Sequence, residues 1–287
     1  MHAPPTPAPL ADDAPRRRRT PLLVKASAAL HLGAGAAVVA SPEVWPWALG
    51  ALVANHALIT GTGLWPRSTW LGQNMRSLPA ASAARGEVSL TIDDGPDPAV
   101  TPAVLDQLDA AGARATFFCI AAHAQAHPQL CREIVRRGHS VQNHSHDHSH
   151  TFSLRGTRAT QREIARAQDT LAQITGQRPR FFRAPAGLRN PFLASVLFDM
   201  NLELVSWTRR GFDTVRSDPR DVLARLTDGL GAGDILLLHD GNAARTAGGE
   251  PVVLSVLPRL LAQFAQAGLR AVTLPDAMPA PAPQAAA

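Results

Sequence analysis

The pattern of hydrophobic positions divides the chain near residue 85. Before that point, two stretches, 22–40 and 44–64, are apolar nearly throughout, whereas short apolar runs alternate with amphipathic segments after it. The first stretch has 19 residues, close to the ~20 that a helix needs to cross a bilayer. The second is weaker, because Pro46 lies at its start and Asn55 and His56 at its middle. Tryptophans at 45, 47 and 65 lie near its ends, as is typical of segments that end at a membrane surface.

Three topologies are compatible with these stretches. In the first, residues 21–66 form a transmembrane helical hairpin in a bacterial-type inner membrane. No Lys or Arg occurs between Ala26 and Pro66, whereas Arg16–Arg19 and Lys25 precede this interval, so the rest of the chain is expected in the cytoplasm. In the second, only the first helix inserts and the remainder is periplasmic. In the third, residues up to Ala40 are a signal peptide and the protein is secreted.

From residue 87 onward the pattern predicts strands that alternate with helices. Such alternation is typical of a parallel sheet, and at this length it predicts a closed or nearly closed (β/α)7-type barrel of the α/β class, preceded by one or two N-terminal membrane helices. A linker is expected over 67–84, the barrel domain over 85–275, and disordered Pro/Ala-rich or basic segments over 1–20 and 276–287. The expected strands are 87–92, 114–120, 140–143, 180–183, 202–207, 234–238 and 269–274, and the expected helices are 102–111, 128–137, 157–175, 191–200, 219–230 and 252–267.

Composition narrows the partners only slightly. The 287 residues include 28 Lys and Arg against 23 Asp and Glu, for a net charge of +5, and every basic residue except Lys25 is Arg. No motif of interleaved basic and aromatic residues supports a nucleic-acid partner. Cys119 and Cys131 are too few for a disulfide framework or a four-thiolate metal site.

The residues capable of chemistry follow the expected strands. In barrels of this kind, active sites lie at the carboxyl ends of the strands, so side chains in these positions are expected to meet. Five of the seven repeats carry such residues, namely Asp93-Asp94, His144 with His148, Arg183, Asp213 and His239-Asp240.

Asp94 and the histidine cluster suggest a metal site. Gly95 and Pro96 form a turn in which Asp94 can bind a metal while Asp93 faces a substrate. Two pairs with i, i+4 spacing, His144/His148 and His146/His150, can chelate one ion on a helical turn, and the spacing leaves open which pair does so. Two His and one carboxylate suit Zn²⁺, and also non-haem Fe²⁺. His239 is then a candidate proton donor to a leaving group, and Arg183 either pins Asp93 or forms a surface ion pair.

The ordered set of motifs resembles the polysaccharide deacetylase family, also called carbohydrate esterase family 4 or the NodB homology domain. The resemblance covers roughly residues 85–275 and implies that His144 and His148 are the ligand pair. It rests on Thr91-Ile92-Asp93-Asp94-Gly95-Pro96, His144-Ser145-His146-Asp147-His148, Arg183-Ala184-Pro185-Ala186-Gly187, Trp207 with Asp213, and Leu237-Leu238-His239-Asp240.

The resemblance implies a distorted (β/α) barrel and a role for each motif. Asp93 is expected to be the general base, oriented by Arg183, and His239 the general acid, supported by Asp213. Asp94, His144 and His148 are expected to bind a divalent metal, with Zn²⁺ as the first choice and Co²⁺ or another ion as alternatives. Leu237 is expected to line the pocket for the acyl methyl, and Pro185, Gly187 and Trp207 to contact the substrate.

The implied function is hydrolysis of an N-acyl group, acetyl or formyl, from an amino sugar in a glycan or a lipid-linked saccharide. The chain departs from the family at Asp213-Thr214, where a Trp commonly follows the Asp and walls the substrate groove. This departure and the membrane segment favour an atypical substrate. The alternatives are hydrolysis of a non-sugar amide or an O-acetyl ester on the same fold, and a catalytically idle membrane protein that binds metal or glycan.

Overall fold

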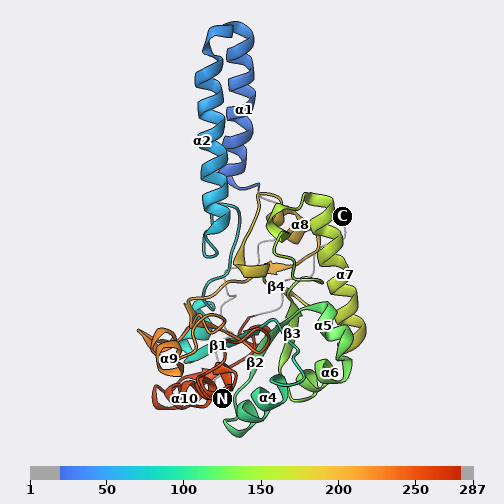
Figure 1. Cartoon of the computed structure of the whole chain (residues 1–287), viewed down its shortest axis with the longest axis vertical. Coiled ribbons are helices and arrows are strands. Elements are labelled where there is room, and N and C mark those ends of the chain that lie inside the picture. Colours follow the sequence, from blue (N-terminus) through green and yellow to red (C-terminus); the bar gives the residue numbers. More distant parts are fainter. Residues whose placement is uncertain (1–19, 279–287) are drawn as a thin grey trace, which may run out of the picture.

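The computed structural model describes residues 20–278, and Figure 1 shows two long helices that project from a compact α/β domain. Nearly all of the predicted disordered segment 1–20 lies outside the described residues, as does most of the predicted tail. The start of that tail differs from the expectation, because the helix α11 (Leu274–Ala277) packs on the barrel and Met278 after it is buried.

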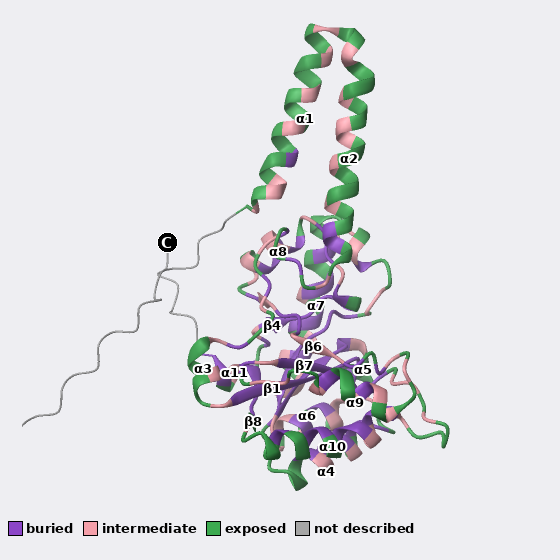
Figure 2. Ribbon diagram, turned by 90° about the vertical axis from the view of Figure 1, so that its left-hand side faces the viewer, coloured by how far each residue is buried: buried purple, intermediate pink, exposed green. Residues whose placement is uncertain are grey.

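The projecting helices are α1 (Leu22–Ala40) and α2 (Trp45–Leu64), joined by the 3₁₀ turn η1 (Pro42–Val44). Among the described helices, α1 alone is both long and apolar enough to cross a membrane, and only 6% of its apolar window is buried. The two helices are joined by polar side chains. Asn55 donates to Ser27 Oγ at 2.8 Å, and His31 Nε2 lies 3.3 Å from His56 Nε2. Figure 2 shows that the remaining surface of the hairpin is largely exposed.

The segment after α2 is packed against the barrel, although the sequence suggested a linker. The backbone N–H of Arg189 donates to the carbonyl of Gly63 at 3.0 Å, and Asn74 donates to the carbonyl of Pro66 at 2.8 Å. Leu71 and Leu78 are buried, and α3 (Ala80–Ala84) leads into the first strand. The base of the hairpin is therefore held in a fixed position relative to the sheet.

Within the described residues, eight strands form one sheet, and every pair of strands in it is parallel, as predicted. The order is β5-β4-β3-β2-β1-β7-β6, with β8 beside β1. The strands are β1 (Glu87–Asp93), β2 (Ala115–Cys119), β3 (Ser140–Asn143), β4 (Phe181–Phe182), β5 (Glu203–Leu204), β6 (Arg209–Arg210), β7 (Ile235–His239) and β8 (Arg270–Ala271).

The sheet does not close into a full barrel. The expected strand 202–207 stops at Leu204, and a separate short strand, β6, begins at Arg209 on the opposite edge of the sheet. The backbone of Met75 fills part of this gap, because it donates to the carbonyl of Leu204 at 2.9 Å and accepts from Ser206 N–H at 2.7 Å. The architecture is therefore a parallel half-barrel.

The helices cover the outer face of the sheet. Alternation along β1 directs Val88, Leu90 and Ile92 toward the helices, where they join the main core cluster. A second cluster, which includes Phe118, Phe181, Trp207 and Leu237, fills the interior. The helices are α4 (Thr101–Ala110), α5 (Ala121–Ala126), α6 (Pro128–Arg136), α7 (Thr157–Thr175), α8 (Leu193–Asp199), α9 (Pro219–Thr227) and α10 (Val252–Gln266), with 3₁₀ turns η2 (Phe152–Leu154) and η3 (Pro185–Gly187).

Candidate active site

The turn after β1 presents both aspartates to one site. Asp94 has a left-handed backbone with φ 74°, so its side chain does not continue the strand alternation that places Asp93 in the interior. The turn is tightly enclosed: a Cβ on Gly95 would lie 2.3 Å from Asp240 Oδ1. Thr101 Oγ1 donates to the same Asp240 carboxylate and so keeps it packed against the turn.

Asp94, His144 and His148 come together at this turn, as the resemblance implied. Asp94 Oδ1 lies 3.3 Å from His144 Nε2 and 3.4 Å from His148 Nε2, and the three ligand atoms are all within 4.8 Å of one another. His144 Nδ1 donates to the carbonyl of Arg183 at 2.9 Å, which leaves the Nε2 lone pair free on the side of Asp94. This donor set fits a divalent cation.

The two histidines do not lie on a helical turn, and that expectation is wrong. Residues 144–151 form a loop in which Ser145 and His148 have left-handed backbones, with φ 64° and 47°. Glu163 of α7 holds this loop by accepting the backbone N–H groups of His146 and Asp147 at 3.1 and 2.8 Å. His146 Nδ1 faces Asp147 Oδ1 at 2.5 Å, and neither His146 nor the exposed His150 belongs to the group of three ligands.

Arg183 is buried against Asp93. Its Nη1 donates to Asp93 Oδ1 at 2.7 Å and to Thr91 Oγ1 at 2.8 Å, and its Nη2 donates to the carbonyl of Ser206 at 2.9 Å. The guanidinium also lies 4.1 Å above the centre of the Phe118 ring. The other oxygen of Asp93 lies 3.7 Å from His144 Nε2, so the carboxylate is fixed with one oxygen facing the three ligands. Arg183 therefore pins Asp93 and is not a surface residue.

His239 and Asp213 form a second buried pair. Asp213 accepts from His239 Nδ1 at 2.9 Å and from the backbone N–H of His239 at 2.7 Å, so its two oxygens hold both the ring and the strand end. Burial by itself lowers the pKa of His239, but the charge and hydrogen bond of Asp213 outweigh burial and raise this pKa to about 9. His239 is thus protonated near neutral pH, with Nε2 as its free nitrogen.

Comparison with known proteins identifies the family to which this fold belongs. A sequence model of the polysaccharide deacetylase family matches residues 80–205. The chain is 33% identical over 168 residues to the chitooligosaccharide deacetylase of Sinorhizobium fredii, which covers 58% of this chain and 78% of that protein. This chain belongs to the polysaccharide deacetylase family. The resemblance carried by the motifs is confirmed.

Other members of the polysaccharide deacetylase family match over most of their length. A peptidoglycan-N-acetylglucosamine deacetylase of Bacillus cereus is 28% identical over 197 residues, which cover 66% of this chain and 86% of that protein. The structure of a family 4 carbohydrate esterase from Streptomyces lividans in complex with acetate superposes with a TM-score of 0.58 at 33% identity. This superposition covers 65% of this chain and 91% of that one.

The predicted substrate-contacting residues of this polysaccharide deacetylase are all buried within the half-barrel domain. Trp207 and Leu237 are 6% and 1% exposed, and Pro185 and Gly187 are buried in η3. Gly187 has φ 72°, and a Cβ there would lie 2.6 Å from Pro66 and 2.9 Å from Trp207. The segment just after α2 therefore reaches the motif that was expected to contact substrate.

Sequence reasoning missed several supports of the site. His123 of α5 donates from Nδ1 to the backbone carbonyl of Asp94 at 2.9 Å, and the Glu163 and Asp240 carboxylates hold the two ligand-bearing loops. Glu163 and His123 lie on helices without any motif, so no local signal marks them. Asp240 was singled out with His239 at the end of its strand, but its support of the turn after β1 was not predicted.

Proposed function

We propose that this chain is a metal-dependent hydrolase that removes an N-acyl group, in the first place acetyl, from an amino sugar. One observation carries the proposal. A site of three metal ligands lies at the carboxyl end of the sheet together with two ionisable groups, Asp93 held by Arg183 and His239 held by Asp213. Such a combination suits hydrolysis, because binding alone needs neither a base nor an acid. The deacetylase relatives reported above support the same chemistry.

The metal would be held by Asp94, His144 and His148. Two imidazole nitrogens and one carboxylate oxygen suit Zn²⁺, and they accept Co²⁺ and other divalent ions. When bound, the ion supplies Lewis acidity that polarises the acyl carbonyl and promotes ionisation of the attacking water. The ligand geometry is set by the protein, since the Arg183 carbonyl fixes the tautomer of His144.

Asp93 is the proposed general base. Its carboxylate lies beside the metal ligands and accepts the proton of the attacking water, while the ion pair with Arg183 keeps it oriented. The Arg183 side chain is 1% exposed and bonded at every side to Thr91, Val205 or Ser206, so it cannot swing away.

His239 is the proposed general acid. An amine is a poor leaving group unless it is protonated as the C–N bond breaks, and a protonated imidazole can supply that proton. Asp213 keeps Nδ1 of His239 engaged, so Nε2 is the nitrogen that donates. Trp207, Leu237, Pro185 and Gly187 are proposed to shape the pocket for the acyl group and the sugar.

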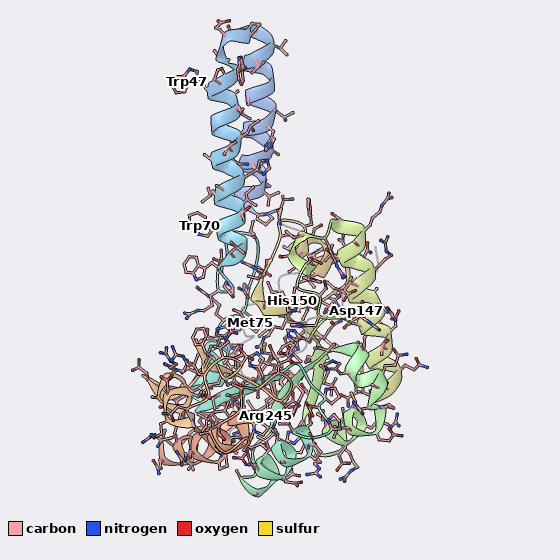
Figure 3. All side chains as sticks on the ribbon, viewed as in Figure 1. Trp47, Trp70, Met75, Asp147, His150 and Arg245 are labelled. Atoms are coloured by element: carbon pink, nitrogen blue, oxygen red, sulfur yellow. The ribbon has the colours of Figure 1, made fainter. Side chains whose placement is uncertain are left out.

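The hairpin is proposed to span a bilayer with the barrel on the cytoplasmic side. At 19 and 20 residues, α1 and α2 are each about as long as a ~30 Å hydrocarbon core, and α2, the less apolar of the two, is joined to α1 through Asn55 and Ser27. Figure 3 places Trp47 near the far end of the hairpin and Trp70 at its base, as expected for aromatic residues at two membrane surfaces. A substrate linked to a lipid of the inner leaflet fits this placement.

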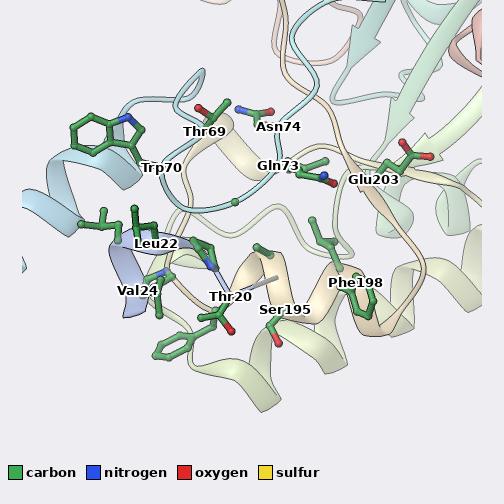
Figure 4. A pocket seen from close by; sticks show the side chains of 18 of the residues that line it. Thr20, Leu22, Val24, Thr69, Trp70, Gln73, Asn74, Ser195, Phe198 and Glu203 are labelled. Atoms are coloured by element: carbon green, nitrogen blue, oxygen red, sulfur yellow. The ribbon is translucent and has the colours of Figure 1, made fainter. Parts of the chain in front are cut away.

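An apolar cavity of about 1370 Å³ lies at the same base, between the start of α1, residues 69–75 and α8 (Figure 4). It exceeds the roughly 300–1,000 Å³ of small-molecule pockets. No predicted site residue lines it, so it is separate from the proposed catalytic centre.

The direct test is detection of acyl loss by mass spectrometry. Soluble and lipid-linked N-acetyl and N-formyl amino sugars are incubated with the full-length protein loaded with Zn²⁺ or Co²⁺. We expect loss of the acyl group from at least one amino sugar, and no loss with Asp93→Asn. Absence of turnover on the whole panel by metal-loaded protein would contradict the proposal.

A further inference from the structure

Arg210 lies at the end of β6 and faces the interior. It pairs with Leu237 of β7, and paired residues of parallel strands direct their side chains to the same face. Leu237 belongs to the interior cluster, and His239 follows it two residues later on the same face. The Arg210 guanidinium lies 5.3 Å from the centre of the Trp207 ring, and the Arg183 guanidinium lies 5.8 Å from that ring.

Arg210 has no anionic partner among residues 20–278. No ion pair or side-chain hydrogen bond joins it to any described residue, and its Nε is buried without an acceptor. The other arginines near it are paired: Arg183 with Asp93, Arg209 with Asp234, and Arg225 with Asp221. A guanidinium remains charged in proteins, and a half-buried charge without a partner is costly.

Aromatic rings hold Arg210 in place. Its guanidinium lies 4.9 Å from the centre of the Phe212 ring as well as near Trp207. Phe212 has a left-handed backbone with φ 59° and directly precedes the buried Asp213. The positive charge therefore lies at the end of β6, three residues before Asp213 and four before Thr214, the position at which the family commonly has the groove-wall Trp.

A second arginine lies beside the same segment. Arg67 Nη1 donates to the backbone carbonyl of Thr208 at 3.3 Å, and within residues 20–278 no carboxylate pairs with it. Arg67 is the third residue after the end of α2, which places it at the level where the proposed membrane span ends. Within residues 20–278, two guanidinium groups without a carboxylate partner thus approach this segment, Arg210 near the Trp207 ring and Arg67 at the Thr208 carbonyl.

We propose that Arg210, together with Arg67 from the segment after α2, binds a phosphate group carried by the amino sugar substrate. The inference rests on the proposed function and narrows its substrate class to phosphorylated acylamino sugars. The planar fork of a guanidinium matches phosphate oxygens, and two of them suit a phosphate better than a single carboxylate charge. The phosphate can belong to a free sugar phosphate or to the headgroup of a lipid-linked sugar.

The first test compares kcat/KM for N-acetylglucosamine 1-phosphate and for the neutral methyl glycoside of N-acetylglucosamine. Charge-assisted hydrogen bonds of this kind correspond to a preference of roughly 10- to 100-fold for the phosphorylated sugar. Arg210→Met should remove most of this preference, and Arg210→Lys should retain part of it. Arg225→Met is the matched control, because Arg225 lies 5.9 Å from the same Phe212 ring but is paired with Asp221, and it should keep the preference.

The second test measures binding without turnover. Isothermal titration calorimetry of the full-length protein in detergent is expected to show phosphate-dependent binding of N-acetylglucosamine 1-phosphate that Arg210→Met loses and Arg225→Met keeps. If no amino sugar loses its acyl group but this binding is present, the proposed function fails and the phosphate site stands. A preference unchanged in a folded Arg210→Met protein, no preference in the native protein, or equal binding of glucuronate would overturn the inference.

The source of the phosphate is distinguished by a third substrate. The kcat/KM for the same sugar phosphate esterified to a lipid is compared with the kcat/KM for the free sugar phosphate, both in detergent micelles. The substrate with the higher value shows whether the phosphate belongs to a lipid-linked sugar or to a free sugar phosphate. Dependence of that preferred substrate on Arg210, but not on Arg225, supports the inference. Independence from Arg210 for both substrates would overturn it.

Discussion

Asp93 and Asp94 are adjacent in the sequence but have different surroundings. Asp93 is bound by the Arg183 guanidinium, whereas Asp94 faces the imidazoles of His144 and His148. Burial by itself raises the pKa of Asp94, but hydrogen bonding and charge from His144 outweigh it and keep this pKa below its usual range. The difference between the two carboxylates follows from the reversal of the backbone at Asp94.

Substitution of each aspartate by asparagine should separate their functions. Asp93→Asn is expected to lower kcat by roughly 100-fold or more, because the proton acceptor is lost, while the metal content stays unchanged. Asp94→Asn is expected to lose bound metal as well as turnover. Acyl release and elemental analysis of the same preparations measure both effects. Full activity in Asp93→Asn would exclude Asp93 as the base.

The His239–Asp213 pair predicts a pH dependence of activity. His239 must be protonated to donate, and its pKa of about 9 keeps it so at neutral pH. Asp213→Asn removes the charge that raises this pKa, so the alkaline decline of kcat should move to lower pH. A pH–rate profile measures the shift. An unchanged alkaline limb in a folded Asp213→Asn protein would contradict the assignment of His239 as acid.

The same pair predicts a pH dependence of stability. The pKa of His239 is raised from 6.5 to about 9 in the folded state, so the pair stabilises the fold fully below the unfolded value. This stabilisation is lost as the pH rises through 9. In protein freed of metal by a chelator, the difference in Tm between native and Asp213→Asn protein should be large near about pH 6 and small near about pH 10.

At the scale of elements, the loops after the strands carry the site, and their close packing allows little change. Gly95 lies against the Asp240 carboxylate, which is itself held by Thr101. A second close approach occurs at Gly241, where a Cβ would lie 2.5 Å from the carbonyl oxygen of Asp94. The β1 and β7 loops thus touch through glycine backbones, and this contact keeps Asp94 close to His239.

Gly95→Ala should therefore destabilise the fold. The added methyl overlaps the Asp240 carboxylate, and such overpacking costs roughly 1–3 kcal/mol. Gly231→Ala is a matched control, because a Cβ there would meet no atom of the described residues within 4 Å, and it should change stability by less than about 0.5 kcal/mol. Thermal unfolding of both variants measures the difference. Equal Tm values for the two would show that the turn after β1 is not closely packed.

At the scale of the molecule, the hairpin and barrel are joined through the base of α2. This base also contacts the η3 turn, so the hairpin is packed against one of the motifs of the proposed site. We expect a reporter enzyme that is active only in the cytoplasm to be active when it is fused after Ala287. A reporter that is active only in the periplasm should be inactive at the same position. The opposite result would favour the single-helix or cleaved-signal topologies.

Local sequence patterns predicted most elements because their causes are local. The helix α7 was expected over exactly the residues it occupies, since its apolar face is periodic and Gly176 ends it in a left-handed conformation with φ 72°. The predicted bounds of the strands agree less well with the structure. β4, β5 and β8 are only two residues long, because a strand extends only as far as its neighbours supply backbone partners.

The amino-acid sequence by itself determined the parallel α/β class and the order of the motifs, because periodicity and residue type are properties of neighbouring positions. Only the tertiary structure decided how the sheet ends beyond β5. There the backbone of Met75 pairs with Val205, which is about 130 residues away in the sequence. The tertiary structure also decided that a loop held by Glu163, and not a helix, joins His144 to His148, and that Arg210 has no carboxylate partner among residues 20–278. Each of these depends on contacts between distant segments, which no local pattern specifies.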